Sequence, residues 1–299
     1  MKPRVGVIGV GVMGMGVAKA LLERGFAVAV CDIVPEREAQ AVAHGATRDF
    51  SAVEVTITLV VDAAQTRQVL ENGVRDDFPP RGKSSLTPFS SVVMMCSTIA
   101  PSDTEVIAAG LAGRGIDMLD APISGGPARA HAGTLSMMAS GSDATFSRCA
   151  PVIEAMSSKC FRMGERPGDG SRMKVVNNML AAANLAAGCE AMALASKLGL
   201  VLDVAADVVN ASSGGSWIFA DRMARALRGD YAPRAAARVL LKDVGLFVHE
   251  ARNLGLTAPM AECAREIFHD TVARGLGEED DAAVLKRYAQ AWNANIPKA

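Results

Sequence analysis

Three glycines and one carboxylate near the start of the chain have the types and spacing that could hold a dinucleotide. Gly9, Gly11 and Gly14 follow an apolar strand expected over residues 5–8, in the pattern GxGxxG. The first glycine allows a tight turn, the second lets backbone approach a pyrophosphate, and the third lets the following helix pack on the strand. Asp32 ends a second apolar run, where a carboxylate can bind ribose hydroxyls. The glycines alone would suit an ordinary turn, but the whole arrangement predicts a dinucleotide site.

The residues around Asp32 favour NAD over NADP. A 2′-phosphate would lie against the negative charge of Asp32. The next residues, Ile33, Val34 and Pro35, include no arginine to receive that phosphate. We therefore expect NAD as the cofactor.

A second group of candidates lies near the start of a long apolar helix expected over residues 171–198. Lys174 and Asn178 are four residues apart and therefore share one face of that helix. Burial disfavours the charged form of a lysine and lowers its pKa toward the range in which it exchanges a proton with a substrate hydroxyl. The alternative is that Lys174 reaches solvent at the helix end and Asn178 caps local backbone.

Polar and flexible residues also follow two later strands of the expected sheet. Thr98 follows one apolar strand, and Ser124, Gly125 and Gly126 end another. Ligands gather at the carboxyl ends of such strands, and a hydroxyl beside side-chain-free N–H groups can form a carboxylate-binding nest. An ordinary turn would use the same residues.

Two further residues allow a functional or a structural interpretation. Trp217 lies in a segment rich in glycine and serine that predicts a loop, and it could wall a substrate pocket, although a single tryptophan more often belongs to a core. Lys242 precedes Asp243 on a later helix, where such a pair usually forms a solvated face. The four histidines and six cysteines show no metal-ligand or triad spacing, so we expect no metal.

Composition excludes several classes of partner. The net charge of −1 comes from interspersed signs without a basic stripe, so we expect no nucleic-acid partner. The longest apolar region, residues 175–209, contains charged and amide side chains and is better explained as a buried helix than as a membrane span. Six widely spaced cysteines are typical of reduced core thiols and of a cytoplasmic protein.

The order of the expected elements predicts an α/β fold with two domains. Strands and helices alternate up to about residue 164, which is the pattern of a parallel sheet covered by helices. Strands then vanish, and alanine- and leucine-rich helices follow a turn at residues 166–170. We expect a Rossmann-type NAD-binding domain over residues 1–164 and an all-helical substrate and oligomerisation domain over residues 165–299, joined by a long interdomain helix. The expected strands cover residues 5–8, 27–31, 55–61, 91–97 and 117–124, and the expected helices of the second domain cover residues 171–198, 203–210, 235–253 and 259–274.

With these residues in place, the chain resembles the β-hydroxyacid dehydrogenases, which include 3-hydroxyisobutyrate dehydrogenase, over nearly its whole length. Four blocks carry the resemblance in order: GVIGVGVMGMGVA, DAPISGG, GDGSRMKVVNN and KDVGL. The resemblance implies that Lys174 is the catalytic acid/base. It places substrate contacts on Ser124, Gly125, Gly126 and Asn178. Beyond the three glycines and Asp32, it places cofactor contacts on Val12, Met13, Val60, Val61, Thr98 and Lys242.

Within the family, the segments LVVDAAQ, CSTIAP, LSMMASGSD, EAMALASKLGL and GGSWIFADRM are most similar to the L-threonate dehydrogenases. This similarity implies NAD-dependent oxidation of the C2 hydroxyl of L-threonate to 2-dehydro-L-erythronate. Two alternatives stay open: the same machinery acting on 3-hydroxyisobutyrate, D-glycerate or tartronate semialdehyde, and a non-catalytic dinucleotide-binding module. A polyol acid would require polar side chains around Trp217 and Asp221, whereas a methyl-bearing substrate would require an apolar wall.

The apolar content of the helical domain also predicts a homodimer or homotetramer. One departure from the family is the link over residues 75–91, which is longer than usual. Its prolines and polar residues predict a surface loop that could alter a contact between subunits.

Overall fold

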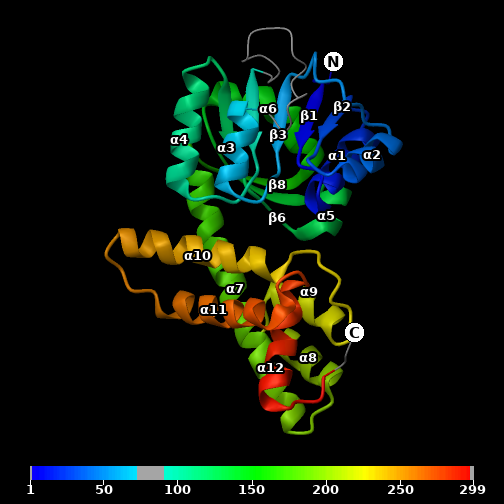
Figure 1. The fold of residues 1–299 in the computed structure, drawn as a ribbon, viewed down its shortest axis with the longest axis vertical. Coiled ribbons are helices and arrows are strands. Elements are labelled where there is room, and N and C mark those ends of the chain that lie inside the picture. Colours follow the sequence, from blue (N-terminus) through cyan, green and yellow to red (C-terminus); the bar gives the residue numbers. More distant parts are fainter. Residues whose placement is uncertain (1, 73–90, 297–299) are drawn as a thin grey trace. The chain divides into compact units, whose positions relative to one another are not determined.

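The structure is a computed structural model that describes residues 2–72 and 91–296. The chain divides into two units, residues 1–174 and residues 175–299, of which the first is built on a β-sheet and the second consists of helices (Figure 1). The predicted fold class, a Rossmann-type unit followed by an all-helical unit, is confirmed. The domain boundary expected between residues 164 and 165 stays a prediction. The loop expected over residues 75–91 lies, apart from Ser91, outside the described residues.

The sheet of the N-terminal unit has the strand order β2-β1-β3-β4-β5-β7-β6, and β8 pairs with β7. The five strands from β2 to β5 in this order are parallel. The first four strands of the chain are short and fully buried, as expected for a sheet covered on both faces. Three are apolar runs, and β3 alternates apolar residues with two threonines. The strands are β1 (Val5–Ile8), β2 (Val28–Cys31), β3 (Val55–Thr58), β4 (Val92–Met95), β5 (Asp117–Asp120), β6 (Ile123–Ser124), β7 (Leu135–Ser140) and β8 (Ser157–Gly164).

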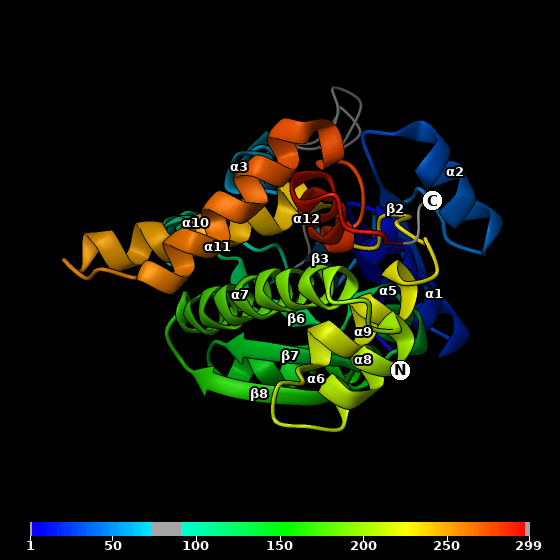
Figure 2. The ribbon, with the colours of Figure 1, turned by 90° about the horizontal axis from the view of Figure 1, so that it is seen from below.

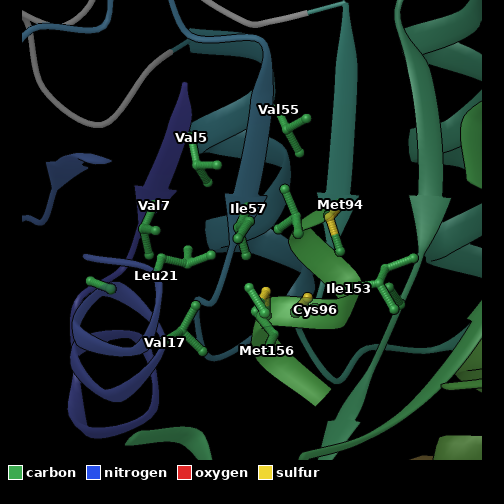
Figure 3. Packing of buried hydrophobic residues seen from close by; sticks show 14 of the residues in the cluster. Val5, Val7, Val17, Leu21, Val55, Ile57, Met94, Cys96, Ile153 and Met156 are labelled. Atoms are coloured by element: carbon green, nitrogen blue, oxygen red, sulfur yellow. The ribbon is translucent and has the colours of Figure 1, made fainter. Parts of the chain in front are cut away.

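Successive side chains of each strand point to opposite faces, so the sheet carries two cores. One core packs against helices α1 and α6, whose side chains in Figure 3 point toward β1, β3 and β4. The other core packs against α3 and α4. The helices of this unit are α1 (Val12–Glu23), α2 (Pro35–Ala43), α3 (Ala63–Asn72), α4 (Pro101–Ala112), α5 (Gly126–Ala132) and α6 (Asp143–Met156).

The edge of the sheet beyond β5 differs from the purely parallel sheet that the sequence predicts. β7 runs antiparallel to β5 and β6, and β8 runs parallel to β7. The expected strand over residues 117–124 is two strands, because β5 ends at Asp120 and β6 resumes at Ile123. Most of β8 is solvent-exposed on both faces, so its residues lack the apolar periodicity that identifies a strand in a sequence.

The C-terminal unit contains most of helix α7 and the helices that follow it. Residues of α7 spaced three and four apart, such as Ala182, Leu185, Ala186 and Cys189, lie in the core of this unit. Helices α10 and α11 run side by side (Figure 2). The helices are α7 (Asp169–Lys197), α8 (Leu202–Asn210), α9 (Trp217–Ala226), α10 (Ala237–Asn253), α11 (Pro259–Thr271) and α12 (Val284–Trp292).

Two helices of this unit, α9 and α12, were not expected from the sequence. The segment predicted as a loop around Trp217 is instead the start of α9, where the Ser216 hydroxyl accepts a hydrogen bond from the backbone N–H of Phe219. Serine is common in loops but is also a good N-cap residue, and Ser216 acts here as the N-cap of α9. After residue 168, the described residues form helices and no strand. The single β-type pairing there is an isolated bridge between Ala236 and Asp280.

Helix α7 is long and apolar enough, by length and composition, to cross a membrane. Its buried apolar residues from Ala182 to Ala193, however, belong to the helical core, which is the role the sequence predicts for this region. All six cysteines lie in the described part of the chain, and none of them forms a disulfide. The expectation of core thiols is wrong for Cys160 and Cys263, which are exposed, because β8 is an exposed edge strand and Cys263 lies on the outer side of α11.

Candidate active site

The glycine-rich turn lies where the direction of the strand order reverses. β1 pairs with β2 on one side and with β3 on the other, so the chain crosses over β1 between these two strands. In open α/β sheets, ligands bind outside the carboxyl ends of strands at such a switch point. The turn after β1 and the residues after β3 meet there, since the N–H of Leu59 donates to the carbonyl of Ile8 at 2.9 Å.

The three glycines of the turn have different steric surroundings. A Cβ on Gly14 would lie 1.9 Å from the carbonyl oxygen of Gly9, and Gly9 itself has a φ of +89° with Leu59 O in the way of any side chain. Gly11 is different, because a Cβ there would meet nothing within 4 Å. The fold therefore requires glycine at positions 9 and 14, whereas at position 11 glycine leaves open space.

That open space lies over the first turn of α1. Gly11 is the N-cap residue and has no side chain with which to cap the helix. The backbone N–H groups at the start of α1, including those of Val12 and Met13, are thus available to an anion at the positive end of the helix dipole. Val12 is exposed and Met13 is half-buried. This arrangement fits a pyrophosphate.

Asp32 follows β2 and reaches the glycine-rich turn. Its carboxylate is almost fully buried and accepts hydrogen bonds from the backbone N–H groups of Val10, at 2.7 Å, and Val34, at 2.9 Å. Each carboxylate oxygen has a second lone pair that a ribose hydroxyl could use. Arg37 lies five residues further on, and its guanidinium is 3.9 Å from Asp32. Arg37 lies beyond residues 33–35, which directly follow Asp32 and hold no arginine.

The residues expected to line the dinucleotide follow β3 and β4. Val60 is half-buried, Val61 is exposed and Thr98 is half-buried. The Ser97 hydroxyl accepts a hydrogen bond from the N–H of Val60 at 3.1 Å and so ties the two strand ends together. Ser97 was not singled out in the sequence, although it shares the position after a strand that identified Thr98.

Ser124, Gly125 and Gly126 form the turn between β6 and α5. Gly125 and Gly126 have φ values of +132° and +73°, which side-chain-bearing residues rarely adopt. All three residues are half-buried, so their N–H groups and the Ser124 hydroxyl are partly accessible. The backbone geometry explains the two glycines and is compatible with a carboxylate-binding nest.

Lys174 is buried and does not reach solvent. Lys174 is 8% exposed, and its Nζ donates a hydrogen bond to the carbonyl oxygen of Ile123 at 2.7 Å. Ile123 directly precedes Ser124, so this contact brings the lysine to the turn that ends in the two glycines. A buried amine beside a candidate carboxylate-binding turn is suited to proton exchange with a hydroxyl of the bound acid.

In the C-terminal unit, Asn178 and Lys242 converge on a residue that the sequence analysis treated as part of a solvated face. Asn178 is 6% exposed, and its Nδ2 donates to Asp243 Oδ2 at 2.6 Å. Lys242 Nζ lies 2.7 Å from Asp243 Oδ1. The alternative of a solvated Lys-Asp face does not fit Asp243, which is buried and contacts both polar residues, whereas the cofactor contact expected of Lys242 stays a prediction.

Trp217 and Asp221 lie on the first turns of α9. Trp217 is 54% exposed, so it is available to wall a pocket and is not a core residue. Asp221 is partly exposed and pairs with Arg222 and Arg225. Arg222 is in turn held by buried Asp281, and burial raises the pKa of that carboxyl to about 6. Among the described residues, no group of three or more His, Cys, Asp or Glu side chains could hold a metal ion.

Comparisons with known proteins agree on the family of the whole chain. Residues 4–164 match the family of the NAD binding domain of 6-phosphogluconate dehydrogenase. Residues 168–288 match the family described as the NAD-binding domain of NADP-dependent 3-hydroxyisobutyrate dehydrogenase. Together the two matches cover both units.

Individual relatives extend this match over nearly the full length. The chain is 40% identical over 294 residues to an L-threonate dehydrogenase of Escherichia coli strain K12, an alignment that covers 95% of this chain and 94% of the relative. It is 38% identical over 292 residues to an L-threonate dehydrogenase of Cupriavidus necator, with 96% of each chain covered. A crystal structure of a 3-hydroxyisobutyrate dehydrogenase from Salmonella typhimurium superposes with a TM-score of 0.85 at 41% identity, covering 96% of this chain and all of the other.

Proposed function

The chain belongs to the β-hydroxyacid dehydrogenases related to 3-hydroxyisobutyrate dehydrogenase, and we propose that it oxidises the C2 hydroxyl of L-threonate with NAD. The observation that carries the reaction type is the buried Lys174, whose Nζ lies at the Ser124 turn. The identity of the substrate is supported by the similarity to L-threonate dehydrogenases over 95% of the chain. The product is the 2-oxo acid 2-dehydro-L-erythronate.

In this proposal the N-terminal unit holds the dinucleotide. The N–H groups over Gly11, Val12 and Met13 bind the pyrophosphate, and Asp32 binds the adenosine ribose. The remaining contacts fall on residues after the neighbouring strands and on the later lysine. These residues are Gly9, Gly14, Val60, Val61, Thr98 and Lys242.

The substrate acid is held through its carboxylate and its hydroxyls. Ser124, Gly125 and Gly126 offer a hydroxyl and backbone N–H groups to the carboxylate. The Asn178 amide, oriented by Asp243, binds substrate hydroxyls, and Trp217 forms part of the wall. Asp221 and its arginine partners supply polar groups near Trp217 along α9, which favours a polyol acid over a methyl-bearing one.

The chemical step removes one hydride and one proton from the substrate. NAD supplies the nicotinamide C4 that receives the hydride from C2 of the acid. Lys174, as the free amine, takes the hydroxyl proton on Nζ while another of its N–H bonds stays directed at the Ile123 carbonyl. The C2–O bond becomes a carbonyl, and Lys174 becomes an ammonium group that returns its proton to solvent before the next turnover.

The deciding experiment is a substrate panel with both cofactors. The purified protein is mixed with NAD or NADP, and nicotinamide absorbance is followed with L-threonate, D-threonate, D-erythronate, D-glycerate and 3-hydroxyisobutyrate. We expect NAD reduction with L-threonate at a kcat/KM at least tenfold above that for any other acid. Activity with another acid would replace the substrate and keep the mechanism. NAD binding without turnover on any acid would favour the non-catalytic dinucleotide-binding module.

A second candidate function is oxidation of 3-hydroxyisobutyrate. It is favoured by the Salmonella structure, which carries that name at 41% identity. The two candidates differ in what the pocket must contact, because L-threonate carries hydroxyls at C3 and C4 and 3-hydroxyisobutyrate carries a methyl group. Substitution of Asp221 by Ala should weaken L-threonate binding and leave 3-hydroxyisobutyrate binding unchanged.

We further propose a homodimer or homotetramer that is located in the cytoplasm. A stripe of apolar residues is exposed along α7 at successive spacings of four, seven, four and three residues: Val176, Leu180, Ala187, Ala191 and Leu194. Such a stripe suits close packing against another helix. Sedimentation should give at least twice the 31.1 kDa mass of one chain, and Leu180→Glu with Leu194→Glu should reduce that mass. Six cysteines that form no disulfide support a reducing compartment.

A further inference from the structure

The carboxylate of Asp120 is fully buried and makes no contact that a substrate could share. Asp120 is the last residue of β5 and is 0% exposed. It is also the first residue of the block DAPISGG, whose later residues form the candidate substrate turn. Asp120 differs from those half-buried residues because its side chain is fully buried and cannot contact a ligand. A buried carboxylate requires other partners.

The contacts of Asp120 all lead to the first turn of α7 or to its support. Asp120 Oδ2 accepts hydrogen bonds from the backbone N–H groups of Gly168 and Ser171, both at 2.9 Å, and Oδ1 accepts one from the Ser171 hydroxyl at 2.8 Å. Ser140 Oγ also donates to Oδ2 at 3.3 Å. The first N–H groups of a helix have no partner within the helix, and a carboxylate there is stabilised by the helix dipole. Asp120 therefore caps α7 from a strand 48 residues earlier in the sequence.

Further contacts hold the first turn of α7 against the sheet and α4. The N–H of Gly170 donates to Ser140 Oγ at 3.1 Å, and Ser171 Oγ lies 2.9 Å from Thr104 Oγ1 of α4. A Cβ on Gly170 would lie 2.5 Å from the carbonyl oxygen of Met138. The start of α7 is thus held against β5, β7 and α4 with no room for a side chain at position 170.

Lys174 lies one helical turn beyond this anchor. Ser171 and Lys174 are three residues apart, which is roughly 4.5 Å along a helix axis. The acceptor of the Lys174 ammonium or amine, the carbonyl of Ile123, is three residues after Asp120 in the same segment. Residues 120–123 therefore position both partners of this hydrogen bond. Asp120 binds the helix that carries Lys174, and Ile123 provides the carbonyl oxygen that Lys174 contacts.

We propose that Asp120 is a positioning residue for Lys174, which fixes the first turn of α7 so that Nζ meets the Ile123 carbonyl and the substrate hydroxyl. This proposal rests on the proposed role of Lys174 as the acid/base. A displacement of about 1 Å in a reacting group can reduce turnover by about 100-fold. Asp120 thus acts on the chemical step without touching substrate or cofactor.

The test compares Asp120→Ala with Asp120→Asn. Alanine removes every acceptor, and we expect kcat to fall by about 30- to 100-fold while the dissociation constant of NAD changes by less than about twofold. Asparagine keeps one oxygen for the N–H groups of Gly168 and Ser171, and its amide can donate to the Ser171 hydroxyl after that hydroxyl rotates. We therefore expect Asp120→Asn to retain kcat within about threefold of the wild type.

A matched control separates positioning from loss of stability. Leu111 is buried on the same helix as Thr104 but belongs to an apolar core, so Leu111→Ala should lower Tm to a similar degree and leave kcat unchanged. All variants are assayed at a temperature at which circular dichroism shows them folded. If Leu111→Ala lowers kcat as much as Asp120→Ala, or if Asp120→Ala leaves kcat unchanged, the proposal is overturned.

Two readouts do not depend on the substrate and keep this inference separate from the proposed function. Hydrogen exchange should become faster in Asp120→Ala at the amides of residues 168–174, and an amine-acylating reagent should label Lys174 at least tenfold faster relative to Lys197. Unchanged exchange and labelling would overturn the proposal even if every acid in the panel were inactive. Should Asp120→Ala fail to fold, Ser171→Ala replaces it; we expect a loss in kcat of about three- to tenfold, and an unchanged kcat would overturn the proposal.

Discussion

Gly11 and Gly14 provide a pair of identical substitutions with opposite expected effects. In Gly11→Ala the new methyl group enters space in which no protein atom lies within 4 Å, and the backbone at Gly11, with φ of −62° and ψ of −166°, is allowed for alanine. In Gly14→Ala the methyl group would lie 1.9 Å from the carbonyl oxygen of Gly9, which is backbone and cannot rotate away. The first change therefore tests the ligand site, and the second tests the fold of the turn.

The magnitudes follow from what each methyl group displaces. At Gly11 it stands where phosphate oxygens approach the N–H groups of the first turn of α1, so at least one charge-assisted hydrogen bond worth about 1.5–3 kcal/mol is lost. That loss corresponds to a rise of about 10- to 150-fold in the Kd of NAD. At Gly14 the overpacking costs about 1–3 kcal/mol of unfolding free energy, which lowers Tm by several degrees.

The assay measures the Kd of NAD by calorimetry and Tm by circular dichroism without ligand for both variants. Gly11→Ala should keep the Tm of the wild type within about 1 °C and lose affinity for NAD. Gly14→Ala should instead lower Tm by several degrees. A Gly11→Ala protein that binds NAD as tightly as the wild type would refute the placement of the pyrophosphate over Gly11.

Three further predictions concern the acid/base, the cofactor and pH. Lys174→Ala should lower kcat by about 100- to 10,000-fold and leave the Kd of NAD nearly unchanged, and equal turnover would remove Lys174 from its role. Asp32→Ser should raise the ratio of kcat/KM for NADP to that for NAD by at least about tenfold, because it removes the charge that repels a 2′-phosphate and leaves Arg37 beside it; an unchanged ratio in initial-rate assays would contradict this. Hydrogen bonds from Arg287 and Arg274 lower the pKa of Asp270, so this carboxylate stabilises the fold above its unfolded pKa of about 3.9 and loses that effect as pH falls through its lower folded pKa. Asp270→Asn should therefore reduce Tm by about 2 °C or less at pH 7 and by nothing measurable at pH 2, and a difference that persists in acid would contradict the assignment.

The parts of the fold that the sequence predicts are those with a local, periodic signal. The buried strands β1 to β4 have four residues each and are apolar apart from two threonines in β3, and α7 shows core residues at helical spacing from Ala182 onward. β8 was missed because an exposed edge strand needs no apolar pattern, and its pairing is with β7 alone among the described strands. α9 was missed because Ser216 serves equally well in a loop and as an N-cap, and only the following hydrogen bond distinguishes the two.

The candidate site likewise contains residues that a local pattern identifies and residues that no local pattern identifies. Residue types at fixed local spacing identified the glycines, Asp32, Lys174 and Asn178. The carboxylates that bind Asn178 and the helix turn before Lys174, however, lie far away in the sequence. Asp243 meets Asn178 from 65 residues away, and Asp120 meets Ser171 from 51 residues away. No spacing rule links such pairs, since each depends on how strands and helices pack and not on the turn or helix in which the residue lies. A buried carboxylate must nevertheless have partners, because an unpaired one carries a large desolvation penalty. The aspartates of DAPISGG and KDVGL are therefore best understood as supports: Asp243 binds the candidate Asn178, and Asp120 binds the first turn of the helix that carries the candidate Lys174.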